Sequence, residues 1–123
     1  MLLDSNILIY GASGDYPALD AILDRTDLAA ASVTRIETLG FYRLSEIERH
    51  WLETAFARMQ ILPLDEAIAT RAIALRQQSQ MGLADAIMAA TALVHRLPLV
   101  TRNVDDFKHL AELEIKNPFA SET

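Results

Sequence analysis

The chain begins Met1-Leu2-Leu3-Asp4-Ser5-Asn6, a short apolar run that stops at a carboxylate and continues in two small polar residues. Three further runs are rich in Leu, Ile, Val and Ala, and a brief apolar run between polar residues is typical of a buried strand. The expected strands span residues 1–3, 28–31, 60–64 and 98–101, and residues 114–116 could form a fifth. The opening stretch therefore predicts a strand whose carboxyl end carries Asp4.

Helical segments separate these expected strands. Pro17 stands where a first helical residue would, so a helix is expected over residues 18–25. Ser45-x-x-Glu48 has the form of a capping box at the start of an amphipathic helix. The apolar residues expected to share one face of that helix are Ile47, Leu52, Ala55 and Met59.

Two more helices are expected in the second half of the chain. Asp65 is expected to cap a helix over residues 66–78, and Gly82 separates it from a helix over residues 83–95. The stretch 86–94 carries no charge, which indicates a helix that is buried on all sides. Strands that alternate with helices predict an α/β fold, namely a three-layer α/β/α sandwich around a mainly parallel sheet of four or five strands.

Length and composition define the class of protein. At 123 residues one domain, residues 1–123, is expected, and an apolar content of 51% is ample for its core. Because the chain has no cysteine, disulfides, thiolate nucleophiles and zinc–thiolate sites are excluded. The 17 acidic and 11 basic residues give a net charge of −6, which excludes a nucleic-acid binder covered in Lys and Arg.

Neither a targeting signal nor a membrane span is expected from the sequence. The N-terminus lacks the basic segment of a signal peptide, and Asp4 interrupts its apolar run. No stretch approaches the roughly 20 apolar residues that cross a bilayer. We therefore expect a cytoplasmic protein that does not associate with a membrane.

Acidic residues stand where the strands of this fold would end, and ligands of open parallel sheets bind beyond the carboxyl ends of the strands. Asp4 follows the first expected strand, Glu37 would lie in the first turn of a helix after the second, and Asp85 opens the uncharged helix. Asp105 and Asp106 follow the fourth strand. Four carboxylates from four segments are therefore expected to meet at one edge of the sheet.

Each acid also has a purely structural explanation. Asp4 could be a turn residue, and Glu37 completes a second capping-box pattern, Thr34-x-x-Glu37. Asp85 is favoured near a helix N-terminus by the helix dipole, although its neighbours on the helix surface are small or apolar. Asp105 and Asp106 could simply begin a last short helix. Only the combination of these acids favours a site.

A cluster of four carboxylates predicts a bound divalent metal. Without a counter-ion the carboxylates would repel and raise one another's pKa. Oxygen ligands without sulfur or imidazole suit Mg²⁺ or Mn²⁺, and the three histidines, His50, His95 and His109, fit no ligand spacing and are expected at the surface. Such an ion can activate water and neutralise a phosphate, so the pattern predicts metal-assisted phosphodiester hydrolysis.

Arginine and aromatic residues give weaker indications. Nine of the 11 basic residues are Arg, which suits phosphate contacts and also ordinary surface ion pairs. Arg35 and Arg102 flank the expected acid cluster, where they could bind substrate or act as charge partners of the acids. The aromatic residues of the middle helices are expected in the core or in a groove for a partner; they are Phe41, Tyr42, Trp51 and Phe56.

Four blocks of the sequence resemble the PIN domain family, especially the VapC-type toxins of bacterial toxin–antitoxin pairs. The blocks are residues 3–8 (LDSNIL), 32–37 (SVTRIE), 83–92 (LADAIMAATA) and 99–107 (LVTRNVDDF), and the ending at 115–119 (IKNPF) is also typical. Together they extend over essentially the whole chain. The resemblance implies a central parallel sheet, a Mg²⁺- or Mn²⁺-dependent endoribonuclease acting on RNA, a homodimer, and a cognate antitoxin as inhibitor.

The resemblance also implies roles for individual residues. The positions that match the family's catalytic acids are Asp4, Glu37, Asp85 and Asp106. The family varies at the fourth acid, and Asn103 occupies the other position used for it, so Asp106 is favoured with Asn103 assisting. Asp4, Asp85 and Asp106 would hold the metal, and Glu37 would orient or deprotonate the attacking water. Asn6 and Thr101 could hydrogen-bond the carboxylates or the phosphate.

Two other functions remain open from the sequence. A receiver-type phosphoacceptor domain would place Asp4, Asp65, Thr101 and Lys116 at strand ends. However, Ser5 stands where the second acid of a receiver's acidic pair is expected, and Glu37 and Asp85 are left unexplained. The second alternative is a PIN-fold scaffold that binds RNA or a protein without cleaving, against which the complete set of acids argues.

Overall fold

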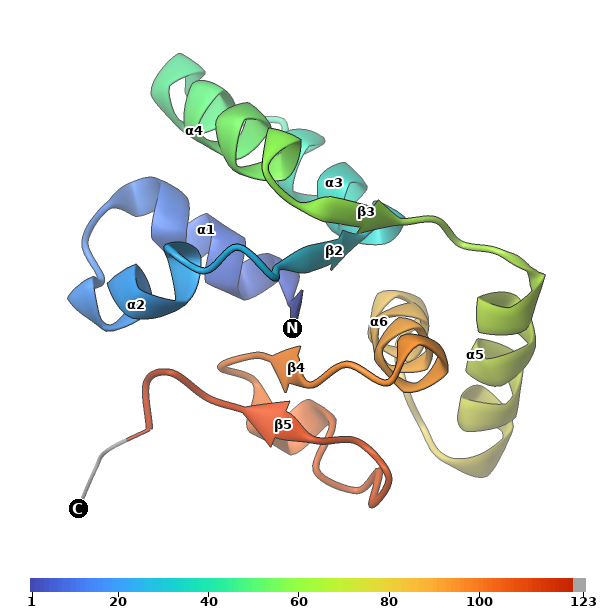
Figure 1. Ribbon diagram of the computed structural model, residues 1–123. Helices are drawn as coiled ribbons and strands as arrows, with labels where there is room; N and C mark the ends of the chain where they lie inside the picture. The colour runs from blue at the N-terminus through green and yellow to red at the C-terminus, as the bar shows by residue number, and fades with distance from the viewer. Residues whose placement is uncertain (121–123) are drawn as a thin grey trace.

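A parallel sheet of five strands runs through the centre of the computed structural model (Figure 1). Its strand order is β3-β2-β1-β4-β5 and every neighbouring pair is parallel. The strands are β1 (Leu2–Leu3), β2 (Ala29–Ala31), β3 (Gln60–Leu62), β4 (Leu99–Val100) and β5 (Ile115–Lys116). All five expected strands are present, each one or two residues shorter than expected. The structure describes residues 1–120, so residues 121–123 of the expected domain lie outside the described part.

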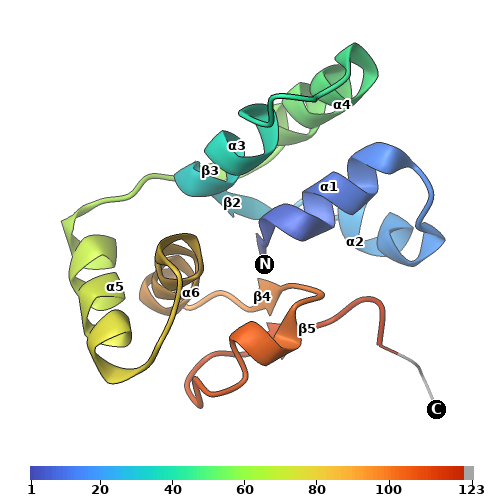
Figure 2. The same ribbon diagram turned by 180° about the vertical axis from the view of Figure 1, so that it is seen from behind.

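Helices cover both faces of the sheet. They are α1 (Ser5–Ser13), α2 (Asp20–Leu23), α3 (Ser32–Leu39), α4 (Glu46–Ala57), α5 (Glu66–Gln78) and α6 (Leu83–His95). Figures 1 and 2 show α1, α2 and α4 on one side of the sheet and α5 and α6 on the other. This arrangement confirms the expected three-layer α/β/α sandwich.

Alternating side chains of the short strands create two separate cores. Leu2 and Leu99 face α5 and α6, where they join the buried residues of α6. Leu3 and Val100, one position further along each strand, face α1 and α4 and pack with Leu52. Because successive strand residues point to opposite faces, two-residue strands are sufficient to anchor both helical layers.

Three helix starts agree with the sequence signals. Ser45 accepts a hydrogen bond from the Glu48 N–H while the Glu48 carboxylate accepts one from the Ser45 N–H, so the capping box is confirmed. Asp65 caps α5 through the Ile68 N–H at 3.0 Å. Helix α6 has the expected bounds, and residues 86–92 are all buried.

Two helical predictions were wrong. The helix expected over 18–25 is a 3₁₀ turn, Pro17–Leu19, followed by the single turn of α2. Ile47 is 82% exposed, whereas Leu52 and Phe56 form the buried face of α4. Five positions of α-helix turn through about 140°, so Ile47 and Leu52 lie on different faces.

Helix α1 was not among the expected elements. It begins directly after β1, with Asp4 as its N-cap and Gly14 in the left-handed region (φ 76°) as its C-cap. Within residues 1–120, no helix combines the length and apolar character needed to cross a membrane.

Candidate active site

The strand order has a reversal between β1 and β4. The chain leaves β1 toward β2 on one side of the sheet, and β4 pairs with the other side of β1. Ligands of open α/β sheets bind outside the carboxyl ends of the strands at such a switch point. Asp4 follows β1 and Thr101 follows β4, so both lie at the switch point.

Asp4 is the most constrained of the predicted acids. It is buried, and one carboxylate oxygen accepts the Ser5 N–H at 2.8 Å. The other oxygen accepts the Thr101 hydroxyl at 2.7 Å and the Asn6 amide at 3.0 Å. Burial raises the pKa of Asp4, and these three hydrogen bonds oppose the rise. The predicted supporting roles of Asn6 and Thr101 agree with these contacts.

Glu37 lies beside Asp4 because α1 packs against α3. The Ser5 hydroxyl donates to a Glu37 carboxylate oxygen at 2.6 Å and lies 3.4 Å from the hydroxyl of Thr34. The capping box expected at Thr34 is wrong: α3 begins at Ser32, so Glu37 lies in the second turn rather than the first. Glu37 is therefore not a capping residue, and its side chain is exposed.

Asp85 connects the acids electrostatically. It lies half-buried in the first turn of α6, and its pKa is raised to about 6. Burial is the main cause, followed by the charges of Asp106, Asp4 and Glu37. The other three carboxylates predicted from the sequence are thus close enough to Asp85 to raise its pKa, although the four come from separate segments.

The fourth acid is distinguished by its neighbours. Asp105 and Asp106 lie in the 3₁₀ turn Val104–Asp106 after β4. Asp105 pairs with Lys108 at 2.9 Å, whereas Asp106 is the acid with the largest charge effect on Asp85. Asn103 donates its backbone N–H to the Thr101 hydroxyl at 3.0 Å. The geometry therefore favours Asp106 over Asp105 as the fourth site residue.

The donor set fits a hard divalent cation. Within residues 1–120, no three His, Asp or Glu side chains are near enough to be ligands of one ion together. Mg²⁺ in proteins is commonly held by one or two carboxylates while water completes its shell, so a cluster of three direct ligands is not required. Four mutually repelling carboxylates without sulfur or imidazole have the chemistry that such an ion prefers.

Comparison with known proteins decides the family. The family model described as PIN domain matches residues 1–113. The chain belongs to the PIN domain family. It is 37% identical to Ribonuclease VapC10 of Mycobacterium tuberculosis (strain ATCC 25618 / H37Rv) over 128 residues, which cover 98% of this chain and 93% of that protein.

Solved structures agree with this PIN domain in fold. A toxin–antitoxin complex from Klebsiella pneumoniae contains a chain with 32% identity and a TM-score of 0.82, with 98% of both chains covered. FitAcB from Neisseria gonorrhoeae has 27% identity and a TM-score of 0.78, covering 98% of this chain and 99% of that chain. The similarity therefore extends over nearly the whole PIN domain.

The receiver-type alternative does not agree with these findings. A receiver-like sheet has the order 2-1-3-4-5, whereas the PIN domain has the order β3-β2-β1-β4-β5. In a receiver domain Asp65 would be the residue that accepts the phosphoryl group. Here the side chain of Asp65 caps α5. Asp65 is therefore a structural residue.

The two arginines predicted to bind substrate and the three histidines lie on the surface. Arg35 is exposed on α3, and Arg102 is exposed next to Thr101. The Arg102 guanidinium lies over the rings of Phe119 and Tyr10 and, within residues 1–120, makes no ion pair with an acid. The histidines are exposed as expected; they are His50, His95 and His109.

Two contacts of the site could not be predicted from sequence patterns. Ser5 holds Glu37, a residue 32 positions away, and Phe119 reaches Arg102 from beyond β5. Both contacts depend on how distant elements pack. The aromatic residues of the middle helices differ in burial. Phe56 is buried, Trp51 is half-buried, and Phe41 and Tyr42 are exposed.

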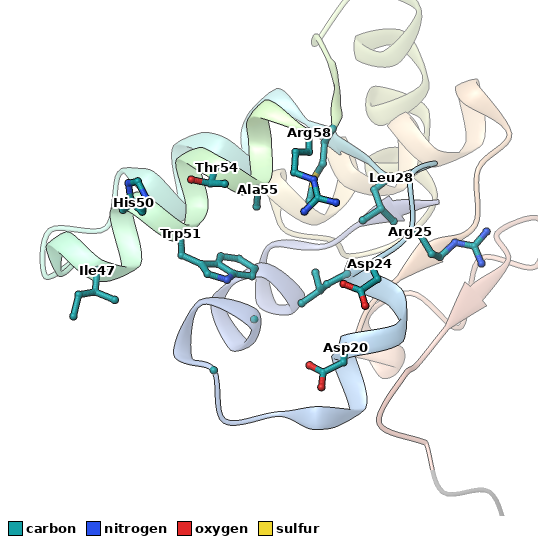
Figure 3. A pocket seen from close by; sticks show the side chains of 14 residues that line it. Asp20, Asp24, Arg25, Leu28, Ile47, His50, Trp51, Thr54, Ala55 and Arg58 are labelled. Carbon is teal, nitrogen blue, oxygen red and sulfur yellow. The ribbon is translucent and has the colours of Figure 1, made fainter.

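A cleft of about 650 Å³ lies apart from the four carboxylates of the candidate site (Figure 3). Figure 3 shows Trp51 and Arg58 on its α4 side and Asp20 and Asp24 on its α2 side. Its lining residue Leu28 precedes β2, so the cleft is at the amino ends of the strands. None of the predicted site residues lines it.

Proposed function

We propose that this PIN domain, as a single domain in the cytoplasm, is a metal-dependent endoribonuclease that hydrolyses RNA phosphodiester bonds and acts as the toxin of a toxin–antitoxin pair. One observation carries the proposal: Asp85 lies within the electrostatic influence of Asp4, Glu37 and Asp106 at the edge of the sheet. The names of the relatives, a ribonuclease and a toxin–antitoxin complex, support the same assignment.

Asp4, Asp85 and Asp106 are the residues that would hold Mg²⁺ or Mn²⁺, one or two of them directly and the rest through water molecules. Such an ion, when bound, lowers the pKa of a water ligand and offsets the charge of the phosphate. Asp4 is fixed in place by Thr101 and Asn6, so its carboxylate needs no reorientation for binding. Asn103 supports the site by holding the Thr101 hydroxyl.

We assign the role of general base to Glu37. Its Oε1 atom accepts the Ser5 hydroxyl, while the side chain as a whole is exposed. The carboxylate can therefore accept a hydrogen bond from a water molecule and take its proton as that water attacks phosphorus. Arg35, exposed on α3, is a cationic side chain that we assign to the RNA phosphates.

RNA cleavage by the purified chain tests the enzyme assignment. We expect cleavage with Mg²⁺ or Mn²⁺, none in chelator, and at least a hundredfold loss for Asp4→Asn or Asp85→Asn with unchanged circular dichroism. Asp105→Asn is the matched control, because Asp105 pairs with Lys108, and it should cleave normally. Equal cleavage by Asp4→Asn, or in chelator, would contradict the proposal, and RNA binding without turnover would favour a non-cleaving scaffold.

The partner assignment needs a separate experiment. We propose a homodimer that binds a cognate antitoxin; the antitoxin is supported by a solved relative that is part of a toxin–antitoxin complex. Co-expression with the product of a small neighbouring reading frame should give a stable complex in which RNA cleavage is lost. Full cleavage by that complex would contradict the toxin assignment while leaving the nuclease assignment intact.

A further inference from the structure

Three aromatic rings contact one another around helix α1, the helix that begins directly after Asp4. Tyr10 comes from α1, Tyr16 from the loop after it, and Phe119 from the segment after β5. The ring centroids are 4.8 Å apart for Tyr10 and Tyr16, 5.5 Å for Tyr10 and Phe119, and 5.6 Å for Tyr16 and Phe119, all with edge-to-face geometry. We call this set of Tyr10, Tyr16 and Phe119 the aromatic cluster.

The guanidinium of Arg102 lies on this cluster. Its central carbon is 4.4 Å from the Phe119 ring centroid and 5.1 Å from that of Tyr10, within the range of a cation–π contact. Arg102 is exposed, and no carboxylate of residues 1–120 forms an ion pair with it. Its positive charge is therefore held by aromatic faces rather than neutralised by an acid.

The backbone of Arg102 belongs to the hydrogen-bond network of Asp4. Its N–H points to the Asn6 side-chain oxygen at 3.4 Å, and the same Asn6 side chain donates to Asp4 at 3.0 Å. The preceding residue, Thr101, donates to Asp4 as well. Arg102 is thus attached to the site through its backbone and oriented by the aromatic cluster through its side chain.

We propose that Arg102 binds a phosphate of the RNA chain at the carboxylate site, and that Phe119 and Tyr10 are positioning residues that hold its guanidinium in place. This inference rests on the proposed ribonuclease function. An Arg stacked on rings keeps its in-plane N–H groups available, and these match the oxygens of a phosphate in a bidentate contact. Stacking also restricts the side chain beforehand, which lowers the entropy lost on binding.

The charge of the site explains why such a residue is needed. Four carboxylates repel an approaching phosphate, and the chain carries a net charge of −6. The guanidinium of Arg102 gives RNA a point of attachment next to the residues that support Asp4. The four acids would act on the phosphate that reacts. Arg102 therefore contributes to binding of substrate more than to the chemical step.

Steady-state cleavage of a single-stranded RNA tests the proposal. For Arg102→Ala we expect KM to rise about tenfold with kcat within about twofold, and the dependence of log KM on log salt to fall by roughly 0.7, the value for one phosphate of a single strand. Arg43→Ala is the matched control, because Arg43 is also exposed and lies 5.4 Å from the Tyr42 ring centroid, but in the turn between α3 and α4. It should change neither KM nor the salt dependence.

The aromatic cluster is tested by a pair of variants at one position. Phe119→Leu keeps an apolar side chain but removes the ring, so KM should rise several-fold. Phe119→Tyr keeps the ring, so its KM should equal that of the wild type. A merely structural role would change the melting temperature without this KM-against-kcat pattern. An unchanged KM and salt dependence in Arg102→Ala would overturn the proposal, as would a loss confined to kcat.

A binding measurement separates this inference from the proposed function. Fluorescence anisotropy of a labelled single-stranded RNA is compared for Asp4→Asn and for the double variant Asp4→Asn/Arg102→Ala. About tenfold weaker binding by the double variant supports the phosphate contact even if the wild-type protein proves not to cleave RNA. Equal binding overturns the contact, whether or not cleavage is found.

Discussion

At the residue scale, Asp4 and Asp85 show two opposite ways of placing a carboxylate in one site. Asp4 is surrounded by donors from Ser5, Asn6 and Thr101, which offset much of the effect of burial. At Asp85, burial first and then the charges of Asp106, Asp4 and Glu37 raise the pKa to about 6. At the metal site we propose, hydrogen bonds already fix the first carboxylate, whereas the second is destabilised in the metal-free protein.

Asp85→Asn should stabilise the metal-free protein. A carboxyl group whose pKa is raised by folding, here from 3.8 to about 6, destabilises the fold above the higher value and not below the lower one. Since Asp85 is only half-buried, we discount the effect to about 1 kcal/mol for solvent screening. Urea unfolding in chelator should show this gain well above pH 6 and no gain below pH 3.8. A wild type that is the more stable protein at the higher pH would refute the explanation.

Removal of the Thr101 hydroxyl should destabilise the fold. Thr101 is fully buried, donates to Asp4 at 2.7 Å and accepts the Asn103 N–H at 3.0 Å. Thr101→Val keeps the shape but removes one of the three donors to the buried carboxylate and the acceptor of the Asn103 N–H, which costs about 1–3 kcal/mol. Thr101→Ser keeps the hydroxyl and should retain most of the stability in the same urea titration. Equal stability of the Val and Ser variants would show that the hydroxyl is unimportant.

The sequence revealed the acids of the site individually but not their contacts. Asp4, Glu37, Asp85 and the pair Asp105 and Asp106 could be chosen because strand ends of a parallel sheet share one edge, and the resemblance to the PIN family favoured Asp106 within that pair. In the structure, Asp105 pairs with Lys108, whereas Asp106 has the largest charge effect on Asp85. The contact of Ser5 with Glu37 joins two helices whose packing no local pattern encodes.

At the element scale, the strongest sequence signals were those with a local cause. The capping box at Ser45 and the cap at Asp65 are satisfied within a few residues of the chain, and both are confirmed. The Thr34-x-x-Glu37 pattern has the same form, yet α3 starts at Ser32 with Ala31 as N-cap. The chain passes from β2 directly into α3, so the end of the strand sets the start of the helix.

Helix α1 was overlooked for a comparable reason. Asp4-Ser5-Asn6 is rich in turn formers, and the next apolar residues, Ile7 to Tyr10, have the β-branched and aromatic character of a strand. The decisive signals were Asp4 as an N-cap and Gly14 as a left-handed C-cap. A residue that was interpreted as a strand end is also a helix start.

Gly11→Ala should displace the single tryptophan. A Cβ atom at Gly11 would lie 2.6 Å from Cη2 of Trp51 and 3.0 Å from Cδ1 of Leu23, so the Trp51 indole would have to move. We expect a red shift of tryptophan emission and a stability loss of about 1 kcal/mol, since overpacking outweighs the better helix propensity of Ala. Gly82→Ala, where a Cβ meets nothing within 4 Å, is the control and should leave the emission unchanged. Unchanged emission of Gly11→Ala would contradict the packing argument.

At the scale of the whole molecule, the acidity of the chain is concentrated. Four of the 17 acids belong to the proposed site, so 13 remain against 11 basic residues and the rest of the chain carries a charge of only −2. A divalent ion reverses the local sign where a phosphate must lie. A net charge of −6 is therefore compatible with an RNA substrate, although it first argues against a nucleic-acid binder.

Divalent metal should stabilise the whole molecule. An ion that binds only the folded state contributes about 2.7 kcal/mol at a hundred times its dissociation constant, so Mg²⁺ or Mn²⁺ should raise the melting temperature by several degrees. Asp4→Asn and Asp85→Asn should lose most of this rise, and Asp105→Asn should keep it. Scanning fluorimetry with and without chelator gives the melting temperatures of the wild type and the three variants. A rise of equal size in Asp4→Asn and wild type would place the metal elsewhere.

The hydrogen bond between Thr101 and Asp4 spans 97 positions of the chain. At translation rates of about 5–20 residues per second, Asp4 is made roughly 5–20 s before its partner. During that interval the first strand has no β4 beside it and the first acid lacks the hydroxyl that holds it. A nascent chain that has not yet reached residue 101 therefore lacks the hydroxyl that positions the first acid, so the site we propose cannot be complete before that point of synthesis.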